Sequence, residues 1–375
     1  MNLNRVLEQI RRKYLLRQDS MDEGGWKTIN GTHVLIDDNG EMVGGPENLR
    51  NWNNARREKN GAKKPRTKAE PLKAENFPAA FQKGTEKTNL QKLIEFVNKC
   101  EGADPKVVAL FNKMGKLENL ASNGVSFKIS HAKKCQVITT INAFTGVLTD
   151  VKLSIPKLQG DDLHGQINTI IHEEMHLMDL FGRSDESKSD GWFSSGRQSL
   201  MDCFSKRSID MSDEIMKLFS DFNKAHTETS QKIRDDAKKK IHELRQKYCP
   251  DGKEIWQLRS ADFKQYEKEE KKLIAEMEAQ RDYECRNLMG GGIPHLQDIY
   301  DAFSGGDSKG VILKYGHGSR YYSDVGRRVE ETVANYACLS ITRPDLVDML
   351  RRDKPELVKE LDSCVEDLLK KAEER

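Results

Sequence analysis

The chain has 375 residues, and its 62 Lys and Arg residues nearly balance its 60 Asp and Glu residues, which gives a formal net charge of +2. A balance this close to neutral argues against a nucleic-acid-binding surface that extends over the whole molecule. Charged residues make up 33% of the chain and hydrophobic residues 36%, which predicts long solvated helices or linkers beside the core.

The sequence contains no apolar run near the roughly 18 residues that a membrane-spanning helix needs. Its first residues, charged from Arg5 onward, lack the apolar stretch of a signal peptide. We therefore expect a cytoplasmic protein with no membrane partner. The seven cysteines are widely spaced and never form a C-x-x-C pair, which indicates reduced thiols and no disulfide framework or cysteine-ligated zinc.

Residues 1–50 predict an N-terminal helix followed by a small β module. Apolar residues recur among basic ones over 1–20, as in an amphipathic helix. The turn dipeptides Asn30-Gly31 and Asn39-Gly40 then separate short alternating runs, which indicates a β-meander. This stretch resembles a short W-x-T-x-x-G-x-H-V-x-I-D module of phage and prophage proteins, which implies a phage or mobile-element origin.

Residues 51–76 are rich in Lys, Arg, Asn and Ala, which predicts a flexible basic linker. The alternative is a tether to nucleic acid or to another anionic surface, because basic residues cluster within 56–68. We expect the linker, since Trp52 is the one aromatic residue available for base stacking there.

A globular domain is expected over 77–345. Helical periodicity predicts helices at 87–100 and 104–121, and the period then changes to two. Three strands follow, at 125–130, 136–141 and 147–155, which we expect to form a small antiparallel sheet.

Directly after these strands, residues 172–176 read His-Glu-Glu-Met-His, an H-E-x-x-H pattern within a helical apolar periodicity. Histidines at i and i+4 share one face of a helix, so His172 and His176 can bind one Zn²⁺ ion. Glu173 follows the first ligand, where its carboxylate can take a proton from a water molecule at the metal. The pattern therefore predicts a zinc-dependent hydrolase.

The segments 211–248 and 253–288 are long, charged and helical, with a strong turn between them. We expect an antiparallel helical hairpin, 211–288, inserted into the globular domain. A charged C-terminal helix is expected over 346–375.

A third metal ligand must come from elsewhere in the chain. Asp179 and Gly182 stand three and six residues after His176, where metzincins have Gly and His. A later apolar-periodic segment contains two adjacent glutamates, Glu330 and Glu331. Adjacent side chains on a helix point about 100° apart, so only one of the two can face the metal helix.

The order of helices, small sheet and metal helix resembles the catalytic domain of zincin metallopeptidases. The segment Glu331-Thr-Val-Ala-Asn335 is similar to the E-x-x-A-[DN] pattern of gluzincins, with Asn in place of the commoner Asp. This resemblance implies that Glu331 is the third ligand and that Asn335, one turn later, hydrogen-bonds a ligand histidine. It also implies that an edge strand beside the metal helix binds the peptide substrate, for which the strand at 147–155 is the candidate.

Residues 298–306 and 315–322 carry the series D-I-x-D-A-x-x-G-G and G-H-G-x-x-Y upstream of the glutamates. The series resembles the C-terminal metallopeptidase-like segments of phage and prophage Mu F-type head-associated proteins. It is also similar to lethal-factor-like metallopeptidases, in which a Tyr before the ligand Glu assists the tetrahedral intermediate. The resemblance implies this role for Tyr322 or Tyr321, with His317 as a second candidate.

These motifs together predict an α+β, mostly helical, zincin-like metallopeptidase that cleaves protein or peptide substrates, as an endopeptidase in preference to an exopeptidase. The alternatives are a virion-associated structural or assembly protein with little activity, bound to phage head components, and an effector peptidase of the polymorphic-toxin type. The expected location is the cytoplasm of a bacterial host, or a virion. The expected site comprises Zn²⁺ on His172, His176 and Glu331, with Glu173, Tyr322 and His317 as catalytic residues.

Overall fold

The chain forms two compact units in the computed structural model, residues 1–66 and 67–375, which are described separately. The structure describes the following residues: 25–29, 32–36, 42–44, 69–118, 125–131, 135–142, 148–155, 164–182, 192–205, 210–250, 254–307 and 317–374. Among them, none of the helices combines the length and the apolar character that crossing a membrane requires.

The first unit contains the β-meander that the sequence predicts. Strands β1 (Gly25–Ile29), β2 (Thr32–Ile36) and β3 (Met42–Gly44) pair antiparallel in the order β1-β2-β3. The helix expected over 1–20 and most of the expected linker lie outside the described residues.

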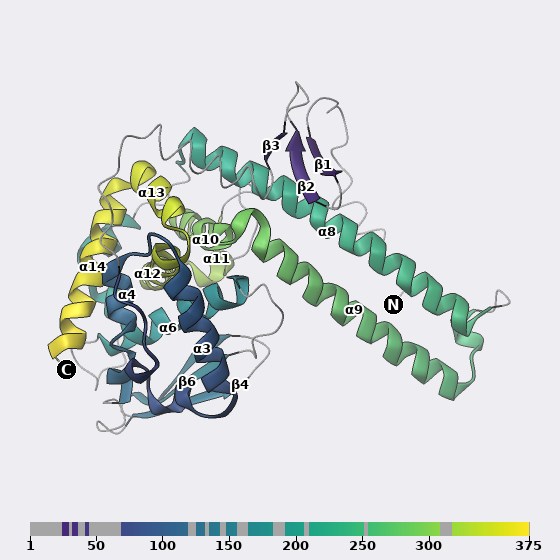
Figure 1. The fold of residues 1–375 in the computed structure, drawn as a ribbon, viewed down its shortest axis with the longest axis horizontal. Coiled ribbons are helices and arrows are strands. Elements are labelled where there is room, and N and C mark those ends of the chain that lie inside the picture. The colour runs from purple at the N-terminus through teal and green to yellow at the C-terminus, as the bar shows by residue number, and fades with distance from the viewer. Residues whose placement is uncertain are drawn as a thin grey trace. The chain divides into compact units, whose positions relative to one another are not determined.

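The second unit is mostly helical (Figure 1). Its α-helices are α3 (Gly84–Lys99), α4 (Pro105–Phe111), α6 (His164–Phe181), α7 (Gln198–Cys203), α8 (Asp213–Tyr248), α9 (Ser260–Asn287), α10 (Ile293–Ser304), α11 (Gly318–Tyr321), α12 (Val325–Thr342), α13 (Pro344–Asp353) and α14 (Pro355–Glu374). Short 3₁₀ turns are η1 (Ala74–Asn76), η2 (Ala79–Gln82), η3 (Met114–Glu118), η4 (Ser194–Gly196), η5 (Ile255–Gln257) and η6 (Leu288–Gly290).

The body of this unit begins before Phe77. Leu72, which the sequence places in the linker, is 2% exposed, and its backbone N–H donates to Asn98 Oδ1 at 2.8 Å. At the other end, α13 and α14 contribute Leu350, Leu361 and other buried residues to the same core. The C-terminal helices are therefore part of this body.

The sheet in this unit is mixed, which corrects the antiparallel sheet expected from the sequence. Strands β4 (Ser126–His131), β5 (Gln136–Ile141) and β6 (Leu148–Ile155) lie in the order β4-β6-β5. β5 pairs antiparallel with β6, whereas β4 pairs parallel with it. β6 is fully buried at Val151 and Leu153, as suits a central strand. The strand at 147–155 is therefore not an edge, and β5 is.

Helix α12 forms the centre of the body. All residues from Glu331 to Thr342 are buried, and α6 and α10 both pack against this helix. Such burial around a whole helix is typical of the middle of a helical core. α12 thereby holds a fixed position beside α6, the helix that carries His172 and His176.

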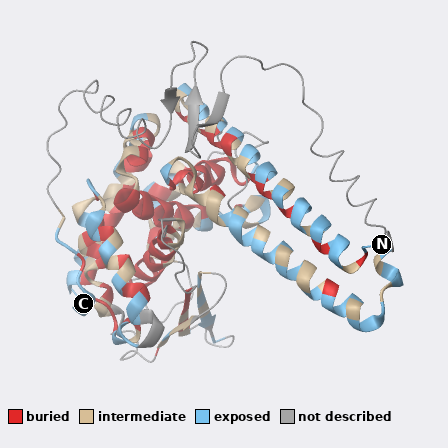
Figure 2. Ribbon diagram, turned by 45° about the vertical axis from the view of Figure 1, so that its right-hand side comes forward, coloured by how far each residue is buried: buried red, intermediate tan, exposed pale blue. Residues whose placement is uncertain are grey.

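Helices α8 and α9 form the long hairpin that the sequence predicts, and they run side by side in Figure 1. The first turns of α8 nevertheless belong to the body, because Ile215, Phe219 and Phe222 are 0% exposed and join the main core. Figure 2 shows the change from buried to mostly exposed residues along the two helices.

Candidate metal centre

Helix α6 brings two histidines to the inside of the body. Its apolar residues Ile167, Ile171 and Met175 are at most 1% exposed and anchor the helix in the core. His172 and His176 lie one turn apart and are 9% and 8% exposed. Two imidazoles therefore lie in an interior from which most water is excluded.

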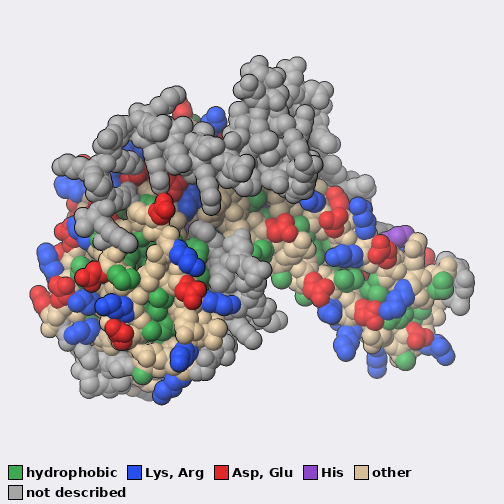
Figure 3. Space-filling view, in the orientation of Figure 1, with side chains coloured by type: hydrophobic (Ala, Val, Ile, Leu, Met, Phe, Trp, Pro, Cys, Tyr) green, Lys and Arg blue, Asp and Glu red, His purple; other side chains and the backbone are tan. Residues whose placement is uncertain are grey.

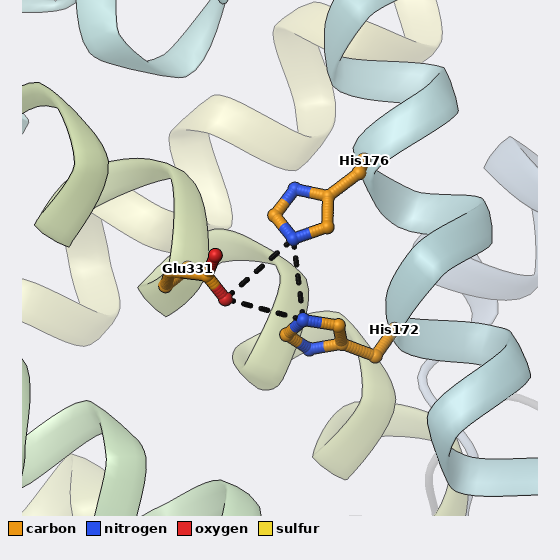
Figure 4. A group of neighbouring side chains, drawn as sticks. All are labelled: His172, His176 and Glu331. Carbon is orange, nitrogen blue, oxygen red and sulfur yellow. Dashed lines mark hydrogen bonds and ion pairs between the residues drawn. The ribbon is translucent and has the colours of Figure 1, made fainter. Parts of the chain in front are cut away.

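Glu331 on α12 meets these histidines, as Figure 4 shows. Glu331 Oε2 lies 3.2 Å from His172 Nε2 and 3.6 Å from His176 Nε2. The two Nε2 atoms are 3.2 Å apart. The three residues are a group that could hold a metal ion.

The spacing of these three atoms fits zinc. Ligands at about 2.0–2.2 Å from a tetrahedral zinc ion lie about 3.3–3.6 Å from one another. The observed separations of 3.2, 3.2 and 3.6 Å are close to these edges. Glu331 Oε2 is buried and faces the two imidazole nitrogens, so its charge is directed at the point that a cation would occupy between them.

The electrostatics of the group agree with this geometry. Burial opposes ionisation of Glu331, but His176 and His172 lower the pKa of its carboxyl group well below the usual range. Burial would lower the pKa of His176, but the Glu331 carboxylate raises it to about 9. The carboxylate thus stays ionised, and a bound metal would take the place of the imidazole proton.

Glu173 lies next to the edge strand of the sheet. Its Oε2 atom accepts a hydrogen bond of 2.8 Å from the backbone N–H of Val137 on β5. The residue is only partly buried, unlike its neighbours in the motif. The expected general base is therefore located where helix α6 meets β5.

Tyr321, and not Tyr322, contacts the ligand carboxylate. The Tyr321 hydroxyl donates to Glu331 Oε1 at 2.7 Å, whereas Tyr322 is 0% exposed and donates to Asp298 Oδ1 at 2.6 Å. His317 stacks on the Tyr321 ring with centroids 4.1 Å apart, and its Nε2 atom is 3.9 Å from Glu331 Oε1. The structure brings His317 to the site together with Tyr321.

Asn335 shares a helix face with Glu331, as expected, but it does not bond a ligand histidine among the described contacts. Its Nδ2 atom donates to Asp298 Oδ2 at 2.7 Å, and its Oδ1 atom is 2.7 Å from His295 Nδ1. The reason is that α10 lies against α12 and presents Asp298 and His295 to this amide. Burial and the nearby Glu331 carboxylate raise the pKa of Asp298 to about 6.

His295 is a site residue that the sequence analysis missed. Its ring centroid lies 5.6 Å from that of His172. The sequence contains one indication of it: His295 stands three residues before Asp298 and so shares a helix face with this residue.

The segment that begins at Trp192, after α6, also lies against the histidines. The Trp192 ring lies 5.5 Å from that of His176. Asp179, one turn after His176, accepts hydrogen bonds from the backbone N–H and the hydroxyl of Ser194 at 2.7 and 2.5 Å. Glu330 interacts with Ser195 of the same segment, so of the two adjacent glutamates only Glu331 joins the histidines.

Comparisons of the chain with protein-family models, with curated protein sequences and with solved structures find no match.

Proposed function

We propose that this protein is a zinc-dependent endopeptidase of the zincin type. The observation that supports the proposal most directly is the convergence of His172 Nε2, His176 Nε2 and Glu331 Oε2 at the edge lengths of a tetrahedral zinc site. Two helices hold these atoms in place from a common core, so the site is preorganised.

Zinc, when bound there, supplies a Lewis acid and lowers the pKa of water to about 7. Glu173 takes a proton from the attacking water and delivers it to the leaving amine. The Tyr321 hydroxyl donates its one O–H to Glu331 Oε1 in this structure. In the complex it would turn from that carboxylate to the scissile carbonyl oxygen, where negative charge develops. Tyr322 and Asp298 hold Asn335 behind the ligands.

The substrate of this proposal is an extended protein or peptide segment. Among the described strands β5 is at an edge of the sheet, beside Glu173, so the backbone groups on its outer side can pair with a further strand. The resemblance of 25–46 and 298–335 to phage and prophage sequences supports a phage or mobile-element origin, with head components or a bacterial protein as the substrate.

The test combines zinc content with cleavage of β-casein. Wild type and Glu173→Gln should each retain about one zinc per chain, because the ligands are unchanged. Glu173→Gln should lower the cleavage rate about 10²- to 10⁴-fold, the range for loss of a general base. His176→Ala should lose zinc, whereas the control Cys249→Ser should keep both zinc and activity.

The result also separates the alternatives. Stoichiometric zinc without Glu173-dependent cleavage would favour a structural or assembly protein of the virion. Toxicity on expression in bacteria that disappears in Glu173→Gln would favour an effector peptidase. Zinc that survives His176→Ala would contradict the proposed centre.

A further inference from the structure

We propose that the backbone N–H of Val137 has two alternative acceptors: the Glu173 carboxylate in the free protein and a backbone carbonyl of an extended peptide in the complex. Peptide binding at β5 then releases Glu173 for catalysis. The inference rests on the proposed peptidase function and deepens it, because it couples substrate binding to the availability of the base.

The geometry of β5 carries the first step. Val137 lies opposite Leu153 of β6, yet its N–H donates to Glu173 at 2.8 Å and so points away from the sheet. In an antiparallel pair, every second residue points its backbone groups outward. The N–H of Thr139 therefore lies on the same outer edge as that of Val137, where no further strand is paired among the described residues.

The composition of β5 carries the second step. Its sequence, Gln-Val-Ile-Thr-Thr-Ile, contains no charged residue and no proline. Proteins usually protect exposed edge strands with such residues. β4, the other edge of this sheet, contains Lys128, which pairs with Asp150 of β6. Ile138 on β5 is 39% exposed and apolar. The unprotected edge next to Glu173 therefore fits an added strand with uncharged side chains.

The competition between the two acceptors carries the third step. One N–H makes one strong hydrogen bond, so a peptide carbonyl that binds Val137 must displace the carboxylate. A peptide strand compensates for that loss because it bonds to several outward groups of β5 at once. A short substrate that cannot reach Thr139 forms fewer hydrogen bonds with β5, so Glu173 stays bound to the N–H of Val137.

Hydrogen exchange tests whether the bond exists in solution. The Val137 amide should exchange at least about tenfold faster in Glu173→Ala than in wild type, because only the carboxylate protects this outward N–H. In Glu173→Gln the side-chain carbonyl can still accept, and exchange should stay slow. Equally slow exchange in wild type and Glu173→Ala would overturn the proposal.

Peptide binding tests the competition. Glu173→Gln and Glu173→Ala both lack the base, so neither variant should cleave the probe, fluorescein-labelled β-casein. Fluorescence anisotropy should show that the probe binds Glu173→Ala about fivefold more tightly than Glu173→Gln. This is the effect expected when one competing hydrogen bond is removed. Equal binding, weaker binding or no measurable binding to Glu173→Ala would each overturn the proposal.

A second substitution locates the binding on β5. Thr139→Pro in the Glu173→Ala background removes the neighbouring outward N–H and should abolish the gain in affinity, since an outward position of an edge strand tolerates Pro. Thr139→Val is the matched control and should keep the gain. Binding that is unaffected by Thr139→Pro would place the peptide elsewhere and overturn the proposal. Failure of these tests would leave the peptidase proposal intact, because zinc content and Glu173-dependent cleavage are measured separately.

Discussion

The carboxylates of the helical body and those of the α8–α9 hairpin differ in how deeply they and their bonding partners are buried. In the body, Asp298 is 8% exposed and accepts from the buried Tyr322, and Glu331 is 4% exposed and accepts from the half-buried Tyr321. In the hairpin, Glu267 pairs with Lys271 on the surface, where their side chains are 46% and 71% exposed. Figure 3 shows acidic and basic side chains interspersed along the hairpin.

The pKa values show the same contrast. Burial raises the pKa of Glu174, on the metal helix, to about 8. Hydrogen bonds from Gln265, Lys247 and Tyr248 lower the pKa of Glu269, in the hairpin, to about 2. In the body, ionisable groups are held in fixed positions although their burial costs free energy of desolvation. In the hairpin, charged side chains remain solvated and pair with near neighbours. This difference indicates that substitutions in the body change stability and metal binding far more than those in the hairpin.

The largest expected effect comes from deleting the hairpin, and two deletions of different length test it. Deletion of 211–288 takes Phe219 and Phe222 from the core, and losing each large side chain costs about 3–5 kcal/mol. The total stability of a domain is about 5–15 kcal/mol, so this protein should not fold. The hairpin boundary expected at 211 therefore includes residues that belong to the main core.

The matched deletion removes 232–283 and joins the ends with four glycines. Ser230 Oγ and Cys285 Sγ are 3.4 Å apart, so the two helices are in contact at this level. Four residues span the helix spacing of about 8–10 Å. Circular dichroism and zinc analysis should show an intact fold and full metal content. A folded, zinc-bound 211–288 deletion would contradict the proposed role of the first turns of α8.

The next effect concerns the two adjacent glutamates. Glu331→Gln should weaken zinc binding tenfold or more, because it removes the charged ligand. Glu330→Gln should change zinc affinity little, since Glu330 hydrogen-bonds Ser195 and is not part of the group that could hold a metal ion. Competition with a zinc chelator measures both affinities. The opposite order would mean that the register of α12 is wrong by one residue.

Asp353 tests the junction between the body and the hairpin. It accepts hydrogen bonds from Ser212 N at 2.6 Å, at the start of α8, and from the Tyr300 hydroxyl at 2.5 Å. Asp353→Asn should lower the free energy of unfolding by about 1–3 kcal/mol at pH 7, because one donor loses its charged acceptor. Urea unfolding measures the change, and Glu356→Gln, at an exposed position, is the control.

The effect of Asp353 depends on pH in a defined direction. Burial would raise the pKa of its carboxyl group, but the hydrogen bonds from Tyr300 and Ser212 lower it below the usual value. A group with a lowered folded-state pKa stabilises the protein above its unfolded pKa of about 3.9, and the contribution is lost as the pH falls further. The difference between wild type and Asp353→Asn should therefore shrink below about pH 4. A difference that grows on acidification would contradict this assignment.

Glu174 gives an effect of similar size and opposite sign. It is 0% exposed, and neither carboxyl oxygen has a hydrogen-bond partner among the described residues. Glu174→Met keeps the approximate volume and removes the unsatisfied polar atoms, so the free energy of unfolding at pH 7 should rise by about 1–3 kcal/mol. A loss of stability in urea unfolding would show that the carboxyl group has a partner in solution.

The parts of the fold and site that the sequence predicts are those with local signals. His172 and His176 are one turn apart, so helical periodicity alone places them on one face. The long helices of the hairpin follow from the same periodicity and from the turn between them. Glu331 is indicated by a sequence pattern in which Asn335 follows it by one helical turn.

The missed parts depend on packing between distant segments. The parallel pairing of β4 with β6 has no turn residue to mark it, so strand order could not be read from the chain. Tyr321 and Tyr322 are adjacent, and only the packing of α11 decides which hydroxyl meets Glu331. The spacing of His295 and Asp298 places both on one face of α10, but only the packing of α10 on α12 brings His295 to Asn335.

The smallest expected effect is that of an exposed pair in the hairpin, and its orientation makes it testable. Glu267 precedes Lys271 by four residues, the order that a helix dipole favours, whereas Lys272 precedes Glu276 in the reverse order. Double-mutant cycles in urea should give a coupling energy of about 0.3–0.5 kcal/mol for the first pair and less for the second. Both couplings should fall in 1 M NaCl, because the Debye length shortens to about 3 Å. A coupling above about 1 kcal/mol, or one that resists salt, would mean that hairpin charges are desolvated like those of the body, and the contrast between the two regions would fail.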